Sequence, residues 1–154
     1  MLLYKNIINK LIKKNISISV AESCTGGLLS STFVSIPGVS KIFDMGLVVY
    51  SNKSKTMILN IEKNKLKSFG AVSKETATFM IDNLKKISRS DLCISTTGIA
   101  GPKGESKNKP VGLVFIGIKY NKKNIIFKKN FKGTRKQIQE KTVNFVLKEI
   151  ENLI

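Results

Sequence analysis

Hydrophobic residues follow a helical spacing in some segments and an alternating one in others, and the first segments predict a helix, a strand and a second helix. In residues 2–14 apolar positions recur every three or four residues, which predicts an amphipathic helix. Residues 16–20 read Ile-Ser-Ile-Ser-Val, and this alternation predicts a half-buried strand. The apolar-rich residues 28–35 predict the second helix, which Pro37-Gly38 ends.

The middle of the chain continues the alternation of helices and strands. Residues 45–50 predict a second strand, and the polar residues 52–69 predict short helices. Residues 91–96 predict a third strand, and the Gly- and Pro-containing residues 97–110 predict a loop. Between these strands a helix should begin after Ser73 as its N-cap, with an apolar face formed by Ala77, Met80, Ile81, Leu84 and Ile87.

The last third predicts a hairpin and a terminal helix. Residues 111–120 and 124–131 read as two strands joined by the turn residues 121–123. Thr134 and Gln137 have the Thr-x-x-Gln spacing of a capping box, which marks the start of a helix. The apolar face expected for that helix consists of Val143, Val146, Leu147, Ile150 and Ile154.

This order of elements predicts a single α/β domain over residues 1–154, with a mixed, mostly parallel sheet covered by helices. Strands joined by helical crossovers tend to run parallel, so their carboxyl ends share the edge where open α/β sheets bind ligands. Three loops should leave that edge, at residues 23–27, 50–55 and 96–104. Segments that are distant in sequence would therefore converge on one cleft.

The charge is strongly positive, with 27 Lys and Arg against 10 Asp and Glu and a formal net charge of +17. Only Arg89 and Arg135 are arginines, although arginine is preferred for bidentate contacts to phosphates and bases. Lysine, asparagine and isoleucine are all abundant, which indicates a general compositional bias rather than a nucleic-acid interface. We therefore expect no nucleic-acid partner, although the surface would attract small anionic substrates.

The chain has no histidine and two cysteines, Cys24 and Cys93. The lack of histidine excludes Ser-His-Asp and Cys-His hydrolases, so a general base must be a carboxylate, a lysine, a tyrosine or a cofactor. Two cysteines make neither a disulfide framework nor a four-ligand zinc site, and we expect no metal. Because neither a membrane-spanning run nor a secretory leader is evident, we expect a cytoplasmic protein.

The loop at residues 23–27 places a serine between a predicted strand and a predicted helix. Backbone N–H groups near Gly26 and Gly27 could stabilise an oxyanion if Ser23 were a nucleophile. The alternative is that Ser23 or Thr25 only caps the helix. The loop lacks the dinucleotide-binding and P-loop patterns.

A serine nucleophile requires a base, and the second predicted strand delivers Lys55 to the same edge of the sheet. A lysine can serve if burial and nearby positive charge lower its pKa from about 10.4 toward about 7–8. The alternative is a solvated surface lysine, because the pattern alone does not distinguish Lys55 from the other lysines.

Five ordered blocks span nearly the whole chain: AESCTGG at 21–27, GLVVYSNKSK at 46–55, GAVS at 70–73, TGIAGP at 97–102 and KPVG at 109–112. Together they resemble the CinA C-terminal domain family, whose stand-alone members are nicotinamide-nucleotide amidases. The resemblance implies hydrolysis of the carboxamide of nicotinamide mononucleotide, giving nicotinate mononucleotide and ammonia. It also implies a Ser/Lys dyad that works without a metal or other cofactor.

By this resemblance Ser23 is the expected nucleophile and Lys55 the expected general base. Tyr50 could stack on the pyridinium ring or bond the dyad, and Arg135 suits a bidentate phosphate contact. The residues expected to contact the substrate are Cys24, Thr25, Gly26, Gly27, Ser40, Tyr50, Thr97, Gly98 and Arg135. The expected partner is thus a small pyridine mononucleotide, and we expect the protein to form a homo-oligomer.

Several alternatives remain at this point. Val39 precedes Ser40 where many relatives carry a second serine, which puts a role for a serine pair in doubt. Cys24 has no histidine to activate it and is not the expected nucleophile. Glu22 is either an acid in the cleft or a hydrogen-bonding group at the end of the strand. The competing function is a catalytically inactive nucleotide-binding protein that keeps the fold.

Overall fold

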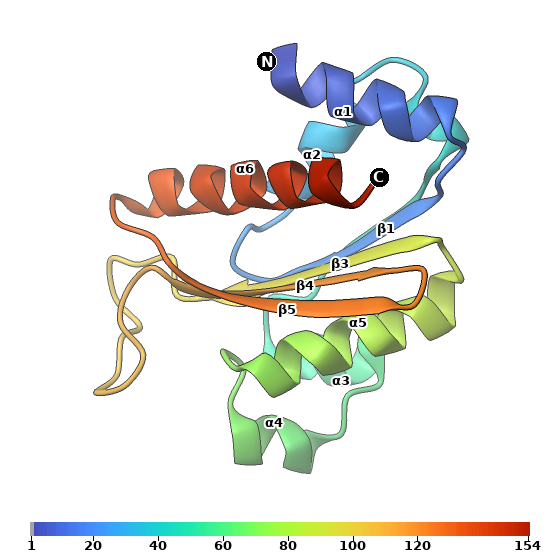
Figure 1. The fold of residues 1–154 in the computed structure, drawn as a ribbon. Helices are drawn as coiled ribbons and strands as arrows, with labels where there is room; N and C mark the ends of the chain where they lie inside the picture. The colour runs from blue at the N-terminus through green and yellow to red at the C-terminus, as the bar shows by residue number, and fades with distance from the viewer. Residues whose placement is uncertain (1) are drawn as a thin grey trace.

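A five-stranded sheet separates the helices into two layers in the computed structural model, which describes residues 2–154 (Figure 1). The strands lie in the order β2-β1-β3-β4-β5. β1 pairs in parallel with β2 and β3, whereas β4 runs antiparallel to β3 and to β5. This arrangement confirms the predicted α/β domain with a mixed, mostly parallel sheet. The strands are β1 (Ile18–Glu22), β2 (Phe43–Val48), β3 (Leu92–Gly98), β4 (Leu113–Tyr120) and β5 (Lys123–Asn130).

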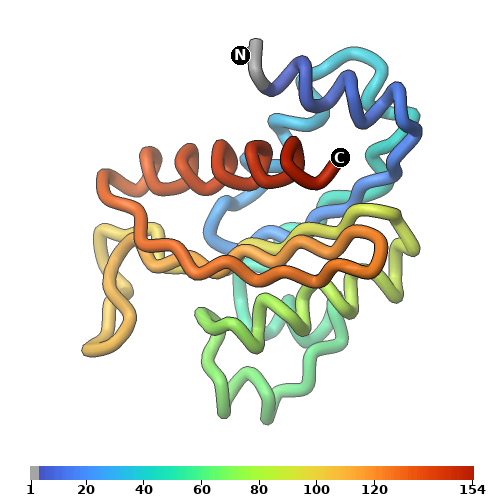
Figure 2. The backbone as a smooth tube through the Cα atoms, in the orientation of Figure 1, coloured from blue at the N-terminus to red at the C-terminus, as the bar shows by residue number. Residues whose placement is uncertain are grey.

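Three helices cover each face of the sheet, as the ribbon and the tube show (Figures 1 and 2). One layer holds α1 (Leu2–Lys13), α2 (Leu28–Val34) and α6 (Arg135–Leu153). The other layer holds α3 (Asn52–Leu59), α4 (Lys63–Phe69) and α5 (Lys74–Ser88). A short 3-10 helix, η1 (Val39–Lys41), precedes β2. Within residues 2–154, no helix has an apolar stretch long enough to cross a bilayer.

Each face of the sheet has its own hydrophobic core. Phe33 of α2 is fully buried beneath α1 and α6, and its ring centroid lies 5.8 Å from that of Phe43. On the other face, Met80 and Leu84 of α5 pack with Leu59 of α3. Truncating a buried residue such as Phe33 to alanine would cost roughly 3–5 kcal/mol.

The structure confirms the predicted starts of α5 and α6. Both starts could be predicted because each depends on contacts within one helical turn. The Ser73 side chain accepts a hydrogen bond from the Thr76 backbone at the start of α5. Thr134 and Gln137 form the predicted capping box at the start of α6. The predicted apolar face of α5 is buried except at Ile87, which is 47% exposed near the end of the helix.

The strand boundaries differ from the predictions where pairing partners decide them. Thr97 and Gly98 belong to β3 rather than to the following loop, because they pair with Phe115 and Val114 of β4. β1 begins at Ile18 and is buried on both faces, since helices cover both sides of this central strand.

The serine pattern in β1 therefore does not mark an exposed face. The Ser19 hydroxyl is fully buried, and it lies 2.6 Å from the Ser90 hydroxyl, within hydrogen-bonding distance. The hairpin turn is also shorter than predicted, because Tyr120 pairs with Lys123 and leaves two residues between the strands.

Candidate active site

Ser23 and Lys55 lie in direct contact at the carboxyl end of the parallel strands. The Lys55 Nζ atom lies 3.1 Å from the Ser23 Oγ atom, although 32 residues separate them in sequence. Ser23 directly follows β1, and Lys55 is in the first turns of α3, which follows β2. The two side chains are 7% and 1% exposed. The structure thus brings the two predicted dyad residues together in a buried site.

Burial of Lys55 shifts its protonation equilibrium toward the uncharged amine. Its Nζ atom donates to the backbone carbonyls of Val49 at 2.9 Å and Tyr50 at 3.3 Å. Burial lowers the pKa of Lys55 below its usual value of 10.5, and burial rather than nearby positive charge is the main cause. A neutral amine that donates to both carbonyls keeps its lone pair for the Ser23 proton. This arrangement provides what a lysine general base requires.

Local capping determines where Lys55 lies. Ser51 and Ser54 form a capping box at the start of α3, which places Lys55 one turn into the helix. The Val49 N–H donates to the Glu22 carbonyl and joins the ends of β2 and β1. Lys55 is therefore fixed relative to β1, the strand that directly precedes Ser23.

The Glu22 side chain caps α2. Its carboxylate accepts hydrogen bonds from the backbone N–H groups of Gly27, Leu29 and Ser30 at 3.0, 3.0 and 2.7 Å. It also accepts one from the Ser30 hydroxyl at 2.6 Å, and Glu22 is fully buried. An anion at a helix N-terminus satisfies unpaired N–H groups and the helix dipole. Of the two alternatives for Glu22, the structure therefore supports the hydrogen-bonding role.

This cap changes the predicted oxyanion donors. The Gly27 N–H is bound to Glu22, and the Gly26 N–H donates to the Ser23 carbonyl at 3.1 Å. Across residues 23–31, all within the described chain, the N–H groups of Cys24 and Thr25 are the two that have no protein acceptor. Both residues are buried. The candidate oxyanion donors therefore lie directly after Ser23 and not at the glycines.

The Cys24 thiol is not suited to act as a nucleophile. Its side chain is buried, and this burial raises the pKa of Cys24 from 9.0 to about 12. The thiol is therefore protonated at neutral pH, whereas thiolates are the reactive form of cysteine. This finding leaves Ser23 as the candidate nucleophile of the loop.

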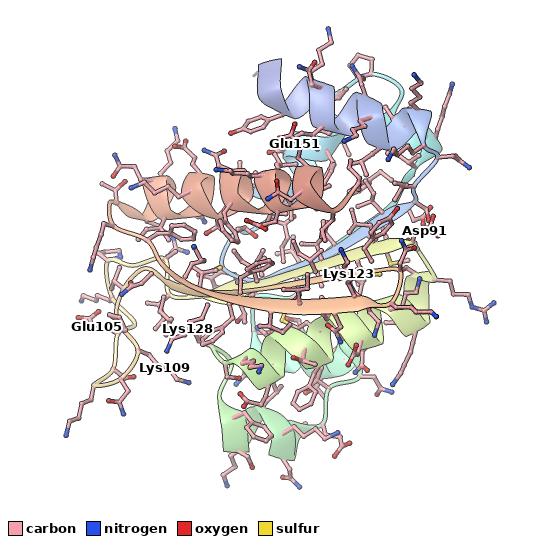
Figure 3. All side chains as sticks on the ribbon, viewed as in Figure 1. Asp91, Glu105, Lys109, Lys123, Lys128 and Glu151 are labelled. Atoms are coloured by element: carbon pink, nitrogen blue, oxygen red, sulfur yellow. The ribbon has the colours of Figure 1, made fainter. Side chains whose placement is uncertain are left out.

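Tyr50 and Arg135 contact each other at the rim of the site. The Arg135 guanidinium donates to the Tyr50 hydroxyl at 2.7 Å and to the Gly101 carbonyl at 2.7 Å. The Tyr50 side chain is 58% exposed, and its backbone carbonyl accepts from Lys55. The first turn of α6 thus joins the loops that follow β2 and β3. The loop after β3, which carries Glu105 and Lys109, projects beyond the sheet near this end of α6 (Figure 3).

Three predicted contact residues have hydrogen-bonding or packing partners within the chain. The Thr25 hydroxyl lies 2.8 Å from the Thr96 hydroxyl, and the Thr97 hydroxyl donates to the Ala71 carbonyl at 2.5 Å. A Cβ atom at Gly98 would lie 2.6 Å from the Leu113 carbonyl oxygen, so only glycine fits against β4 there. These contacts fix the edge of the sheet around the site.

Ser40 lies away from the dyad within this chain. It is exposed in η1, before the amino end of β2, whereas Ser23 follows the carboxyl end of β1. Phe43 of β2 pairs with Ile18 at the start of β1, so the length of β1, roughly 16 Å, separates the two ends. The contact between Ser40 and a substrate stays a prediction.

Gln139 of α6 contacts the nucleophile loop, which the sequence patterns did not predict. Its side-chain amide donates to the Cys24 carbonyl at 2.9 Å. Gln139 lies one turn after Arg135, so the same side of α6 holds both residues. A hollow of about 660 Å³ lies between this side of α6 and the loop at Gly26 and Gly27. Its size suits a small-molecule ligand.

Comparison with known proteins identifies close relatives over almost the whole chain. Residues 2–154 match the CinA C-terminal domain. A CinA-like protein from Petrotoga mobilis is 45% identical over 148 residues, which cover 96% of this chain and 37% of that protein. A CinA-like protein from Endomicrobium trichonymphae is 49% identical over 137 residues, covering 89% of this chain and 32% of that protein. The chain spans about a third of the length of the curated relatives it matches.

Solved structures share the same architecture. The competence/damage inducible protein CihA from Agrobacterium tumefaciens has a TM-score of 0.93 and 35% identity, over 99% of this chain and 93% of that chain. A competence-damaged protein (CinA) superfamily protein from Escherichia coli has a TM-score of 0.92 and 27% identity, over 99% of this chain and 88% of that chain. The names of these relatives state no reaction, so the chemistry of this chain is inferred from the geometry of its own site.

Proposed function

The chain belongs to the CinA C-terminal domain family, and from this premise we propose that it is a serine amidohydrolase that converts nicotinamide mononucleotide to nicotinate mononucleotide and ammonia. The observation that carries the proposal is the buried contact of 3.1 Å between the Lys55 amine and the Ser23 hydroxyl. A serine beside a lysine with a lowered pKa is a nucleophile and base pair for acyl transfer.

In the first step, neutral Lys55 takes the proton of the Ser23 hydroxyl, and the Ser23 oxygen forms a bond to the carboxamide carbon. The carbonyl oxygen gains a negative charge, which the free N–H groups of Cys24 and Thr25 are available to stabilise. The resulting ammonium of Lys55 gives its proton to the amide nitrogen. The carbon–nitrogen bond then breaks, and ammonia leaves.

In the second step, water resolves the ester between Ser23 and the nicotinoyl group. Lys55, neutral again, takes a proton from the water, and the hydroxide oxygen bonds to the ester carbon. The Ser23 oxygen leaves and regains its proton from Lys55. The product is the carboxylic acid, which loses its proton to solvent and becomes the carboxylate, and the dyad returns to its starting state.

The rim of the site supports a mononucleotide as substrate. The exposed ring of Tyr50 provides a surface for a pyridinium ring, and Arg135 provides a guanidinium for a phosphate. The neighbouring hollow beside α6 is large enough for the ribose and phosphate. These features support a substrate that combines an aromatic cation with an anionic group.

The test is ammonia release from nicotinamide mononucleotide by purified protein. We expect release by the wild type, and losses of at least about 1,000-fold in Ser23→Ala and Lys55→Met, since nucleophile and base act as a unit. Lys53→Met is the matched control, because Lys53 is an exposed lysine in the same helix. Absence of ammonia with the wild type would favour the inactive nucleotide-binding alternative, and full activity of Ser23→Ala would exclude the dyad.

A further inference from the structure

We propose that Gln139 is a positioning residue for the oxyanion, because it fixes the orientation of the Cys24–Thr25 peptide group. This inference rests on the proposed serine chemistry and extends it to a residue outside the family motifs quoted above. Gln139 would act through the backbone of the nucleophile loop and would not touch the substrate's reacting carbon.

The geometry of a single peptide unit carries the argument. The Gln139 Nε2 atom donates to the Cys24 carbonyl oxygen at 2.9 Å. The Cys24–Thr25 bond is trans, so its carbonyl and the Thr25 N–H point in opposite directions. Holding the carbonyl toward α6 therefore directs the Thr25 N–H away from α6. That N–H is one of the two donors without a protein acceptor in the loop.

The unpaired donor is itself unusual. Thr25 is 2% exposed, and a buried N–H without an acceptor is costly for a folded protein. Such a cost is explained if the donor is used when negative charge develops on a substrate. A hydrogen bond to the carbonyl of the same unit also polarises the peptide and strengthens its N–H as a donor.

In the described chain, no other hydrogen bond orients the Cys24–Thr25 peptide group. Within residues 2–154, Gln139 is the one donor bonded to the Cys24 carbonyl. Glu22 holds the Gly27 end of the loop, but it does not contact the Cys24–Thr25 unit. Gln139 itself is well anchored, since Ile138 beside it is buried and Arg135 one turn earlier is bonded to Tyr50 and Gly101.

The experiment compares two substitutions of similar length. Gln139→Glu keeps the shape of the side chain but replaces the donor amide with an acceptor, whereas Gln139→Lys restores a donor. Lys148→Gln is the control, because Lys148 is an exposed lysine on α6 that does not line the hollow. Two rates are measured for each protein: ammonia release from nicotinamide mononucleotide, and labelling of Ser23 by a fluorophosphonate probe, followed by intact mass. When Ser23 attacks the probe, negative charge develops on the oxygen of its phosphoryl group, as it would on the carbonyl oxygen of an amide. The labelling rate therefore reports on oxyanion stabilisation without requiring nicotinamide mononucleotide.

We expect Gln139→Glu to lower kcat and the labelling rate by about 10- to 100-fold, a fraction of the effect of losing an oxyanion donor outright. KM for the anionic substrate should rise as well, because Gln139 lines the hollow, whereas the labelling rate is independent of nucleotide binding. Gln139→Lys should recover most of both rates, and Lys148→Gln should match the wild type. Equal rates for Gln139→Glu and wild type would overturn the inference, as would an equal loss in Gln139→Lys. If the wild type labels at Ser23 but releases no ammonia, the substrate proposal fails while the labelling ratio still decides the role of Gln139.

Discussion

Arg135 and Tyr50 are 85 residues apart in sequence, and the Arg135 guanidinium donates a hydrogen bond of 2.7 Å to the Tyr50 hydroxyl. The same guanidinium donates to the Gly101 carbonyl. The rim of the site is therefore arranged before any substrate binds. This arrangement reduces the ordering that binding has to impose on the Arg135 side chain.

Arg135→Ala should weaken the binding of the mononucleotide and leave the riboside unaffected. A charge-assisted contact to phosphate is worth about 1.5–3 kcal/mol, so KM for nicotinamide mononucleotide should rise by about 10- to 100-fold. Nicotinamide riboside lacks the phosphate, and its kcat/KM should stay within about 3-fold of the wild-type value. Steady-state kinetics with both compounds provide the measurement. An equal loss with both compounds would show that Arg135 acts on the fold of the rim and not on a phosphate.

Activity should rise with pH through the lowered pKa of Lys55. Burial disfavours the ammonium, so the folded-state pKa lies below 10.5, and the neutral amine is the form that can accept the Ser23 proton. The fraction of active enzyme therefore increases as pH rises toward and through that pKa. The measurement is kcat/KM from pH 5 to pH 10. A profile that is flat from pH 5 to pH 8, or that falls over this range, would contradict a lysine base.

Cys24 should resist alkylation at neutral pH in the folded protein. The thiol is buried and its pKa is raised to about 12, so the reactive thiolate is scarce at pH 7. Iodoacetamide should leave the folded protein unmodified and active while it modifies both cysteines in guanidinium. Peptide mass analysis after a timed reaction measures this. Rapid modification of Cys24 with loss of ammonia release would indicate an activated thiol.

Glu22→Ala should destabilise the fold strongly. The substitution leaves the N–H groups of Gly27, Leu29 and Ser30 without their acceptor, and that of Leu29 is buried. The typical energies of helix caps and charged hydrogen bonds predict a loss of about 2–4 kcal/mol. Urea denaturation measures the free energy of unfolding. Glu75→Ala is the comparison, because Glu75 is an exposed acidic residue in the first turn of α5 and should cost under about 1 kcal/mol. Similar costs for both variants would contradict the capping role.

The sequence predicts the elements whose signals are local. The caps at Ser73 and Thr134 are read correctly because each depends on residues within one turn. The end of β3 is not, because Thr97 and Gly98 become strand residues only by pairing with β4. The loop pattern at these positions is overridden by a partner that lies about 17 residues later in the chain.

The part of the candidate site that lies in the family motifs could be predicted from the sequence. The resemblance to a family points to Ser23 and Lys55, and the structure brings the two together. The sequence left two alternatives for Glu22 and did not point to Gln139, because the roles of both residues depend on where α2 and α6 pack. The structure explains the role of Glu22: α2 begins after Gly27, which has no side chain to cap the helix, and the Glu22 carboxylate is the acceptor instead.

Synthesis of the chain proceeds toward the helix that completes the site. Arg135 donates hydrogen bonds to Tyr50 and Gly101, and Gln139 donates one to Cys24. The first two turns of α6 therefore contact the loops that follow β1, β2 and β3. A nascent chain on the ribosome contains Ser23 and Lys55 long before residues 135–139 emerge from the exit tunnel. The loops thus gain these ties only once translation has passed the start of α6.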